Sequence, residues 1–335
     1  MEKKQQYASE AEVQEAFDKI QQVEAALNTV VFGQEDLIKL VITGLLSKGN
    51  LLLEGMPGLG KTELVKGLSK VISLATKRVQ FTPDLLPGDI TGTPVLQENE
   101  NGREFVFQKG PVFTHILLAD EINRASPKTQ AALLEAMQEQ RVTVLGETHS
   151  LPSPFFVLAT QNPIDLEGTY PLPEAQLDRF LFKLNIERND VATMQRIIQN
   201  RELGVEPSVE AVMSPEALEE VLSTVRRVYL PEPVANYMAR LVEATHSSES
   251  ARFLKHGASP RAALALAVAA KALAVVNNRN HASFEDVRFL APAVLRHRIQ
   301  LDYAAKVEQK TADDVIDEIL EKVSFDGLET PKALK

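Results

Sequence analysis

The chain has 335 residues, no cysteine and no tryptophan, and its hydrophobic and charged fractions of 44% and 24% are ordinary for a globular protein of up to two domains. The lack of cysteine excludes disulfide frameworks and thiolate zinc sites, and no stretch approaches the roughly 18 uncharged apolar residues of a membrane span. The net charge of −10 and the lack of a basic cluster with interleaved aromatic residues disfavour nucleic acid as the principal partner.

The N-terminal region is predicted to be helical, and residues 1–17 lack the apolar core of a signal peptide, so we expect a cytoplasmic protein. Residues 8–28 carry apolar side chains at helical spacing, and a second helix is expected over Glu35–Leu46. The turn between them, Val30–Gln34, could lie beside a nucleotide base or could be an ordinary connector. Spacing alone does not decide between the two.

A buried strand and a glycine-rich turn occupy the stretch LLLEGMPGLGKT, residues 51–62. The pattern G-x-x-x-x-G-K-[ST] is filled by Gly55, Gly60, Lys61 and Thr62. Glycines let backbone N–H groups surround phosphate oxygens, Lys61 adds positive charge at the β- and γ-phosphates, and the Thr62 hydroxyl can bind Mg²⁺. A helix expected over Glu63–Ile72 adds the partial positive charge of its N-terminus. The stretch therefore predicts a nucleotide-binding loop, although so short a pattern also arises by chance in glycine turns.

A hairpin is predicted after the next strand. That strand is expected at Arg78–Phe81, and the hairpin strands at Pro94–Gln97 and Glu104–Phe107. The dipeptide at 101–102, Asn-Gly, between alternating apolar residues is a strong hairpin signal. Because the hairpin interrupts an alternation of strands and helices, we interpret it as an insertion.

Two adjacent carboxylates, Asp120 and Glu121, end the apolar run Ile116–Ala119, which is typical of a strand buried in a parallel sheet. Such a strand does not tolerate these charges without a partner cation or a catalytic use. Beside a phosphate loop, Asp120 is positioned to hold Mg²⁺, and Glu121 is free to orient and deprotonate an attacking water. The alternative is a solvated start of a loop, which the upstream phosphate loop disfavours.

The following region contains a helix, a second hairpin and another buried strand. Ser126 is the expected N-cap of a helix over residues 127–140, and the hairpin strands are expected at Arg141–Val144 and His149–Leu151. The buried strand is Phe155–Thr160. At its tip, Asn162 could hydrogen-bond the attacking water or the γ-phosphate, or it could cap the turn before a proline.

Arg179 closes a short helix that starts near Pro173. The local sequence allows the guanidinium to pair with Asp178 or Glu174. An arginine at the end of a nucleotide domain could also reach the γ-phosphate held by a neighbouring subunit.

From about residue 187 the strand-like runs disappear, and the remainder is predicted to be helical. The expected helices cover Asp190–Gln199, Ser214–Val225, Pro231–Thr245, Pro260–Val276, Ser283–Arg298 and Thr311–Val323. We place a boundary near residues 188–205, which gives a nucleotide-binding domain at 1–195, with an N-terminal helix in 1–25, and an all-helical domain at 196–335.

Arg261 stands in the first turn of one of these helices, where the helix dipole disfavours a cation. The position makes sense if Arg261 and the helix end jointly face a phosphate. The alternative is a solvated arginine, which would cost roughly a few tenths of a kcal/mol.

Together, these motifs resemble those of AAA+ ATPases. Along the chain stand GMPGLGKT, LLADE, ATQNP, LDRF and ASPRA. The strings DLLPGDITGT, FQKGPVF, LLADEINRASPKTQAALLEAMQE and TQNPIDLEGTYPLPEAQLDRF are closely similar to the MoxR family, and the resemblance spans about residues 25–325. It implies an α/β fold of the P-loop NTPase class, with an αβα core around a five-stranded parallel sheet, two inserted β-hairpins and a smaller all-helical lid domain.

The resemblance also implies roles for single residues. Asn162 would be sensor 1, Arg261 would be sensor 2, and Arg179 would be the arginine finger that acts on ATP held by the next subunit. The predicted ATP/ADP-binding residues are Val31, Phe32, Gly33, Gln34, Met56, Pro57, Gly58, Leu59, Gly60, Lys61, Thr62, Glu63, Asp120 and Arg261. The first four would lie by the adenine, and Thr62 and Asp120 would hold Mg²⁺. The resemblance leaves open whether Arg261 acts in its own subunit or in the next, and it gives no role to Arg124 or to the N-terminal helix.

The function implied by the resemblance is that of a chaperone-like ATPase in which Glu121 activates water and Lys61 and Arg179 stabilise the transferring phosphoryl group. Members of the family form hexameric rings and work with von Willebrand factor A domain proteins, in remodelling or maturation that can include metal or cofactor insertion. One alternative is a nucleic-acid-dependent motor of the same helix-2-insert clade, which the acidic hairpins disfavour. Another is a nucleotide-gated scaffold, which the intact Asp120-Glu121 pair disfavours.

Overall fold

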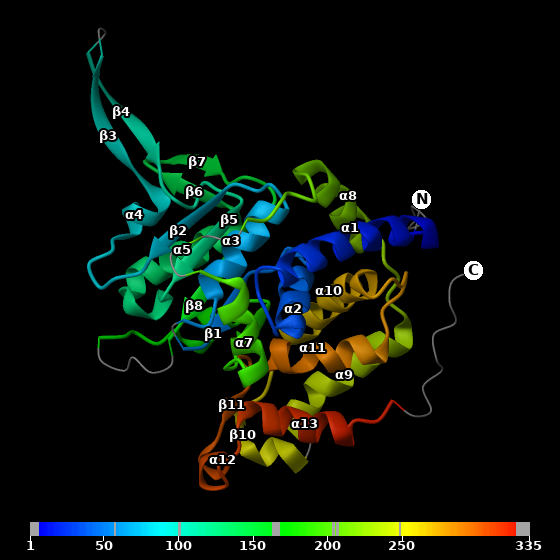
Figure 1. Cartoon of the computed structure of the whole chain (residues 1–335). Coiled ribbons are helices and arrows are strands. Elements are labelled where there is room, and N and C mark those ends of the chain that lie inside the picture. The colour runs from blue at the N-terminus through cyan, green and yellow to red at the C-terminus, as the bar shows by residue number, and fades with distance from the viewer. Residues whose placement is uncertain are drawn as a thin grey trace, which may run out of the picture.

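The structure is a computed structural model, and it describes residues 7–56, 58–99, 102–162, 168–202, 205, 208–247 and 249–325. At its centre lies a five-stranded parallel sheet with helices packed on both faces (Figure 1). A long hairpin projects from one end of the molecule, and the last helices form the opposite end.

The sheet has the strand order β2-β5-β8-β1-β9, and all its neighbouring strands run parallel. Its strands are β1 (Leu51–Glu54), β2 (Thr76–Gln80), β5 (Ile116–Asp120), β8 (Phe156–Gln161) and β9 (Phe182–Asn185). Because parallel strands all end at the same edge, the segments after β1, β5 and β8 meet there. The predicted parallel sheet is confirmed, but β9 is a strand that the residue pattern alone did not indicate.

Alternate side chains of the strands enter two separate buried clusters. Leu52, Leu117 and Val157 face α4 (Pro87–Thr91) and α5 (Pro127–Glu139), whereas Leu51 and Leu53 face the opposite layer. That layer contains α1 (Glu10–Asn28), α2 (Glu35–Leu46) and α3 (Lys61–Val71) together with the lid helices. The continuous apolar runs seen in the sequence are therefore strands covered on both faces.

Both predicted hairpins are present. The first joins β3 (Gly92–Asn99) to β4 (Gly102–Lys109), longer strands than the pattern indicated, and residues 100–101 of its expected turn lie outside the described residues. The second joins β6 (Arg141–Val144) to β7 (Glu147–Ser150). Figure 1 shows the first hairpin extending away from the sheet, as expected of an insertion.

Apart from β9, the described part of the chain from residue 174 onward is helical with one small exception. Its elements are α6 (Glu174–Leu177), α7 (Val191–Asn200), α8 (Pro215–Arg226), α9 (Glu232–Ser247), α10 (Pro260–Val276), α11 (Phe284–Leu295), α12 (Tyr303–Val307) and α13 (Ala312–Lys322). The exception is an antiparallel ladder of β10 (Leu254–His256) and β11 (Gln300–Leu301), which the pattern did not predict because these strands are too short to show alternation.

The N-terminal helix α1 connects the two halves of the chain. A capping box of Ser9 and Glu12 starts α1, and Glu12 also accepts a hydrogen bond from Arg227 at 2.7 Å, just after α8. Lys19 reaches Glu220 of α8 at 2.8 Å. Buried residues of α1, such as Ile20 and Leu27, belong to the same apolar cluster as the lid helices. Within the described part of the chain, no helix has the length and apolar character to cross a membrane.

Candidate functional site

The glycine-rich loop leads from β1 into α3, as its sequence predicts. Gly58 and Gly60 have φ angles of +84° and +82°, a backbone conformation that side chains with a Cβ rarely adopt, and no atom lies within 4 Å of where a Cβ would stand. The loop is thus open toward a ligand. Lys61 Nζ donates to the Gly55 carbonyl at 2.8 Å, and Pro57 lies outside the described residues.

A cavity of about 360 Å³ opens above this loop at the carboxyl edge of the sheet. Of the predicted residues, Gly58, Gly60, Lys61, Thr62, Glu63, Asp120, Glu121 and Asn162 line it. Partial burial lowers the pKa of Lys61, and the nearby carboxylates of Asp120 and Glu121 oppose that shift. The cavity therefore combines backbone donors, a cation and two carboxylates in one place.

The Asp120 carboxylate is buried and held by two partners. Its Oδ1 accepts a hydrogen bond from the Thr160 hydroxyl at 2.8 Å, and its Oδ2 accepts from Arg78 Nη2 at 2.7 Å. Thr160 comes from β8 and Arg78 from β2, the two strands that flank β5. Cross-strand contacts thus fix Asp120 at the floor of the cavity.

Glu121 begins the loop after β5 in a left-handed conformation, with φ of +55°. Its backbone N–H donates to Thr160 Oγ1 at 2.9 Å, while its Oε2 accepts from Gln80 Nε2 and Arg124 Nη1, both at 2.9 Å. A strained backbone at such a residue is common at functional sites. Residue patterns missed Gln80, Arg78 and Thr160, because their contacts join different strands.

Residues of this cavity are of types that suit a nucleotide with Mg²⁺. Magnesium is usually bound by one or two carboxylates together with substrate phosphates, and Thr62 and Asp120 both line the cavity. Within the described ranges, no group of three or more His, Asp or Glu side chains is arranged as a self-sufficient metal site. Together with these two side chains, the phosphate oxygens of a nucleotide would be needed to complete a magnesium site.

The predicted adenine turn lies beside a second, larger cavity of about 870 Å³, which Gly33 and Gln34 line. Gln34 Nε2 donates to Asn189 Oδ1 at 3.3 Å, and the Phe32 ring lies beneath the guanidinium of Arg196 in α7. Arg188, also in this cavity, donates to Met56 Sδ of the phosphate loop at 3.1 Å. The segment between β9 and α7 thus joins the turn to the loop.

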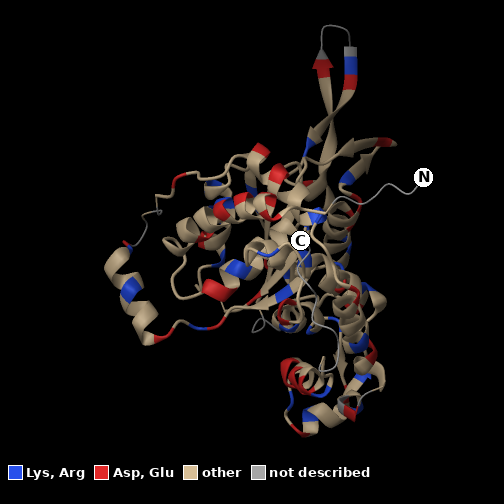
Figure 2. Ribbon diagram, turned by 90° about the vertical axis from the view of Figure 1, so that its right-hand side faces the viewer, with Lys and Arg blue, Asp and Glu red and all other residues tan. Residues whose placement is uncertain are grey.

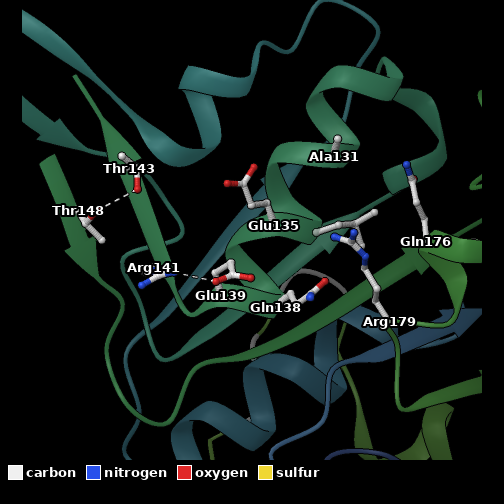
Figure 3. Close-up of a pocket in the computed structure, with 10 residues that line it drawn as sticks. Ala131, Glu135, Gln138, Glu139, Arg141, Thr143, Thr148, Gln176 and Arg179 are labelled. Atoms are coloured by element: carbon white, nitrogen blue, oxygen red, sulfur yellow. Dashed lines mark hydrogen bonds and ion pairs between the residues drawn. The ribbon is translucent and has the colours of Figure 1, made fainter. Parts of the chain in front are cut away.

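Arg179 and Arg261 lie away from the phosphate cavity, and both line a separate hollow of about 300 Å³. Arg261 Nη1 lies 3.5 Å from Asp178 Oδ2. Arg179 also lines a cavity of about 650 Å³ (Figure 3). There it stands with Gln176 on one side, while Glu135, Gln138 and Glu139 of α5 lie between it and the second hairpin.

The segment that carries Arg179 is held by residues just after α11. Arg298, with its side chain 3% exposed, donates to Asp178 Oδ1 at 2.7 Å and to the Phe180 carbonyl at 2.7 Å. Buried His297 donates from Nε2 to the same carbonyl at 3.0 Å. The helix predicted to continue to Arg298 therefore ends at Leu295, and the chain beyond it binds the core.

Comparison with known proteins agrees with this arrangement. Residues 50–182 match the ATPase family associated with various cellular activities (AAA), and residues 246–319 match the AAA lid domain. The chain is 41% identical to the protein named chaperone MoxR1 of Mycobacterium tuberculosis over 303 residues, which cover 88% of this chain and 79% of that one. The chain belongs to the MoxR family of AAA+ ATPases.

Two further proteins match over nearly the whole chain. The uncharacterized protein YeaC of Bacillus subtilis is 44% identical, with 89% of this chain and 92% of that one covered. The solved structure of a putative ATPase from Cytophaga hutchinsonii has a TM-score of 0.86 and 40% identity, over 94% of this chain and 97% of that one. This MoxR-family protein is an ATPase with a P-loop α/β core and a helical lid.

Proposed function

We propose that this ATPase hydrolyses Mg²⁺-bound ATP at sites shared between neighbouring subunits of a homo-oligomeric ring, which we expect to be a hexamer. The ring would use hydrolysis to remodel or help mature partner proteins, including metal or cofactor insertion. A 41% identical relative named a chaperone supports a protein substrate. A von Willebrand factor A domain protein is the partner that we expect.

The observation that carries the proposal is the position of Arg179 relative to the phosphate loop. Arg179 precedes β9, whose first residue Phe182 pairs with Leu51, whereas the phosphate loop follows the other end of β1. About 10 Å of parallel strand therefore separates the two edges of the sheet. This separation favours an Arg179 that serves a neighbouring subunit and not its own cavity.

The pairing of Arg261 with Asp178 supports the same arrangement for the second arginine. Because Arg261 lines the hollow of Arg179 and not the phosphate cavity, we propose that both arginines act on ATP of the next subunit. Two cations would then face the phosphates from across the interface, where they stabilise charge on the transferring phosphoryl group.

Within each subunit, the phosphate loop and Lys61 would bind the phosphates, and Thr62 and Asp120 would hold magnesium. The bound ion neutralises charge on the phosphate oxygens. Glu121 would accept the proton of the attacking water, which Asn162 helps to orient. Since Glu121 Oε2 is engaged by Gln80 and Arg124, its carboxylate would have to leave these partners as the site closes.

The test is the ATPase rate measured against protein concentration, with molecular mass followed by light scattering in Mg-ATP. We expect specific activity to rise with concentration, and Arg179→Ala to abolish it while ATP binding persists. Arg141→Ala is the matched control, because Arg141 lines the same cavity as Arg179 and pairs with Glu139. Activity that is independent of both concentration and Arg179 would overturn the shared site.

A further inference from the structure

Helix α7 has its polar face toward its own chain and its apolar face toward solvent. Thr193 is buried against Gly33, and Arg196 covers the Phe32 ring. On the opposite face, Val191, Met194 and Ile198 are 77%, 46% and 78% exposed. An amphipathic helix of a globular protein normally buries its apolar face. In α7 Ile197 is half-buried, but the rest of the apolar face is exposed.

The apolar face of α7 is a continuous stripe and not scattered residues. Spacings of three and four along a helix place Val191, Met194 and Ile198 in one row. Figure 2 shows α7 standing out from the body of the molecule, at the left of the view. A projecting apolar row of this kind is a candidate surface for contact with another protein.

A second exposed apolar row lies on α10. Leu264 and Val268, one turn apart, are 68% and 46% exposed, and they follow Arg261 on the same side of the helix. They line the hollow of about 300 Å³ that contains Arg179 and Arg261, together with partly buried Leu181. The molecule thus has one apolar row that projects, on α7, and one that lines a hollow, on α10.

The two rows flank the two halves of the proposed shared site. The α7 row begins three residues after Arg188, which touches Met56 of the phosphate loop, and the α10 row begins beside Arg179 and Arg261. We infer that, in the ring, the α7 row of one subunit docks on the α10 row of the next. This inference rests on the proposed function, because it needs the Arg179 side of one copy to face the phosphate loop of another.

Charges around the rows agree with such a contact. Arg188 and Arg196 are exposed beside the α7 row, and so are Glu187 and Asp190 just before it. Lys48, Arg179 and Arg261 line the α10 hollow, and Glu135 and Glu139 are exposed in the adjoining cavity that also contains Arg179. Both rows thus have charges of both signs beside them, which can pair across the contact in one orientation of the two copies.

The contact would also connect ATP binding to assembly. The polar face of α7 rests on Phe32 and Gly33, the turn proposed to lie by the adenine. A nucleotide that orders this turn would fix the direction of the apolar row on the other side of α7. Head-to-tail contacts of this heterologous kind form a ring when the rotation from one copy to the next closes.

The experiment uses the full chain with two double substitutions, each confined to exposed positions. Met194→Gln with Ile198→Gln alters the α7 row, and Leu264→Gln with Val268→Gln alters the α10 row. Glutamine keeps the helix propensity high. Val307→Gln in α12, at a position 64% exposed, is the matched control. Mass by light scattering and ATPase rate are measured across protein concentrations in Mg-ATP, with thermal unfolding to check folding.

We expect each double variant to need at least about tenfold more protein than the control for assembly and activity. An equimolar mixture of the two should regain activity where neither is active alone. In the mixture, the intact α7 row of one variant meets the intact α10 row of the other, which gives particles of two chains with one shared site.

Two results would overturn the inference and leave the proposed function intact. One is normal assembly of both variants. The other is an impaired α7 variant beside a normal α10 variant, because α7 would then pair with itself or with another surface. If the unaltered chain stays monomeric and equally active at every concentration, the shared site itself is wrong, and the inference falls with it.

Discussion

Asp178 receives Arg298 from the end of α11 at 2.7 Å and Arg261 from the start of α10 at 3.5 Å. The same aspartate directly precedes Arg179. Two lid arginines and a core carboxylate therefore set the position of the residue that we propose as the arginine finger. A change in the angle between core and lid would move Arg179, which would give the proposed ring a physical path from hydrolysis to movement.

The buried guanidinium of Arg298 is the centre of this connection, and Arg298→Met should reveal its contribution. The substitution removes the closest donor of Asp178 and one of the two donors to the Phe180 carbonyl, and only Arg261 and His297 remain as partners. We therefore expect the free energy of unfolding to fall by about 3 kcal/mol, the lower end for a broken buried ion pair. Urea denaturation measures the loss. In the control, Arg103→Met breaks an exposed pair with Glu98 and should cost less than about 1 kcal/mol. Equal losses in the two variants would contradict a structural role for Arg298.

Glu121→Gln tests the proposed general base. Glutamine keeps the shape of the side chain but cannot accept a proton from water, so turnover should fall at least about 100-fold while ATP binding is retained. Single-turnover hydrolysis and equilibrium ATP binding separate the two effects. Glu243→Gln, which alters an exposed carboxylate on α9, is the control. Near-normal turnover in Glu121→Gln would exclude this residue as the base.

Thr160→Val tests a positioning residue that the sequence did not single out. The buried hydroxyl accepts from the Glu121 N–H and donates to Asp120 Oδ1, so valine removes both hydrogen bonds and leaves Asp120 with Arg78 alone. We expect a loss of about 1 to 3 kcal/mol in stability. We also expect a fall in kcat of about tenfold, larger than any change in KM, because 1.4 kcal/mol corresponds to that factor. Thr160→Ser should restore kcat, and a serine variant as slow as valine would argue against the hydroxyl.

The sequence predicted those elements that depend mainly on interactions between residues close together in the chain. The helix bounds Glu35–Leu46 and Pro260–Val276 were predicted to the residue, and the loop of Lys61 and Thr62 lies between strand and helix as expected. The order of motifs along the chain was sufficient to indicate the family, because those strings are long and specific.

Contacts between distant parts of the chain could not be predicted in this way. Strand β9 has only four residues, and it is a strand because β1 pairs with it. Arg298 meets Asp178 across 120 positions, and Arg78 meets Asp120 across 42, with no sequence signal for either pair. For α7, the sequence shows that the helix is amphipathic, but only packing shows that its apolar face points outward.

The buried imidazole of His297 makes stability depend on pH. Burial and the nearby charge of Arg298 hold its pKa well below the ordinary value of about 6.5, so the folded chain keeps it neutral. Below about pH 6.5 the unfolded chain binds a proton that the folded chain does not, so stability falls as pH falls, by up to about 1.4 kcal/mol per pH unit. His297→Gln can still donate to the Phe180 carbonyl but does not titrate. Urea denaturation between pH 5 and 7 should therefore give a shallower pH dependence for this variant, and an unchanged slope would show that His297 is not the group responsible.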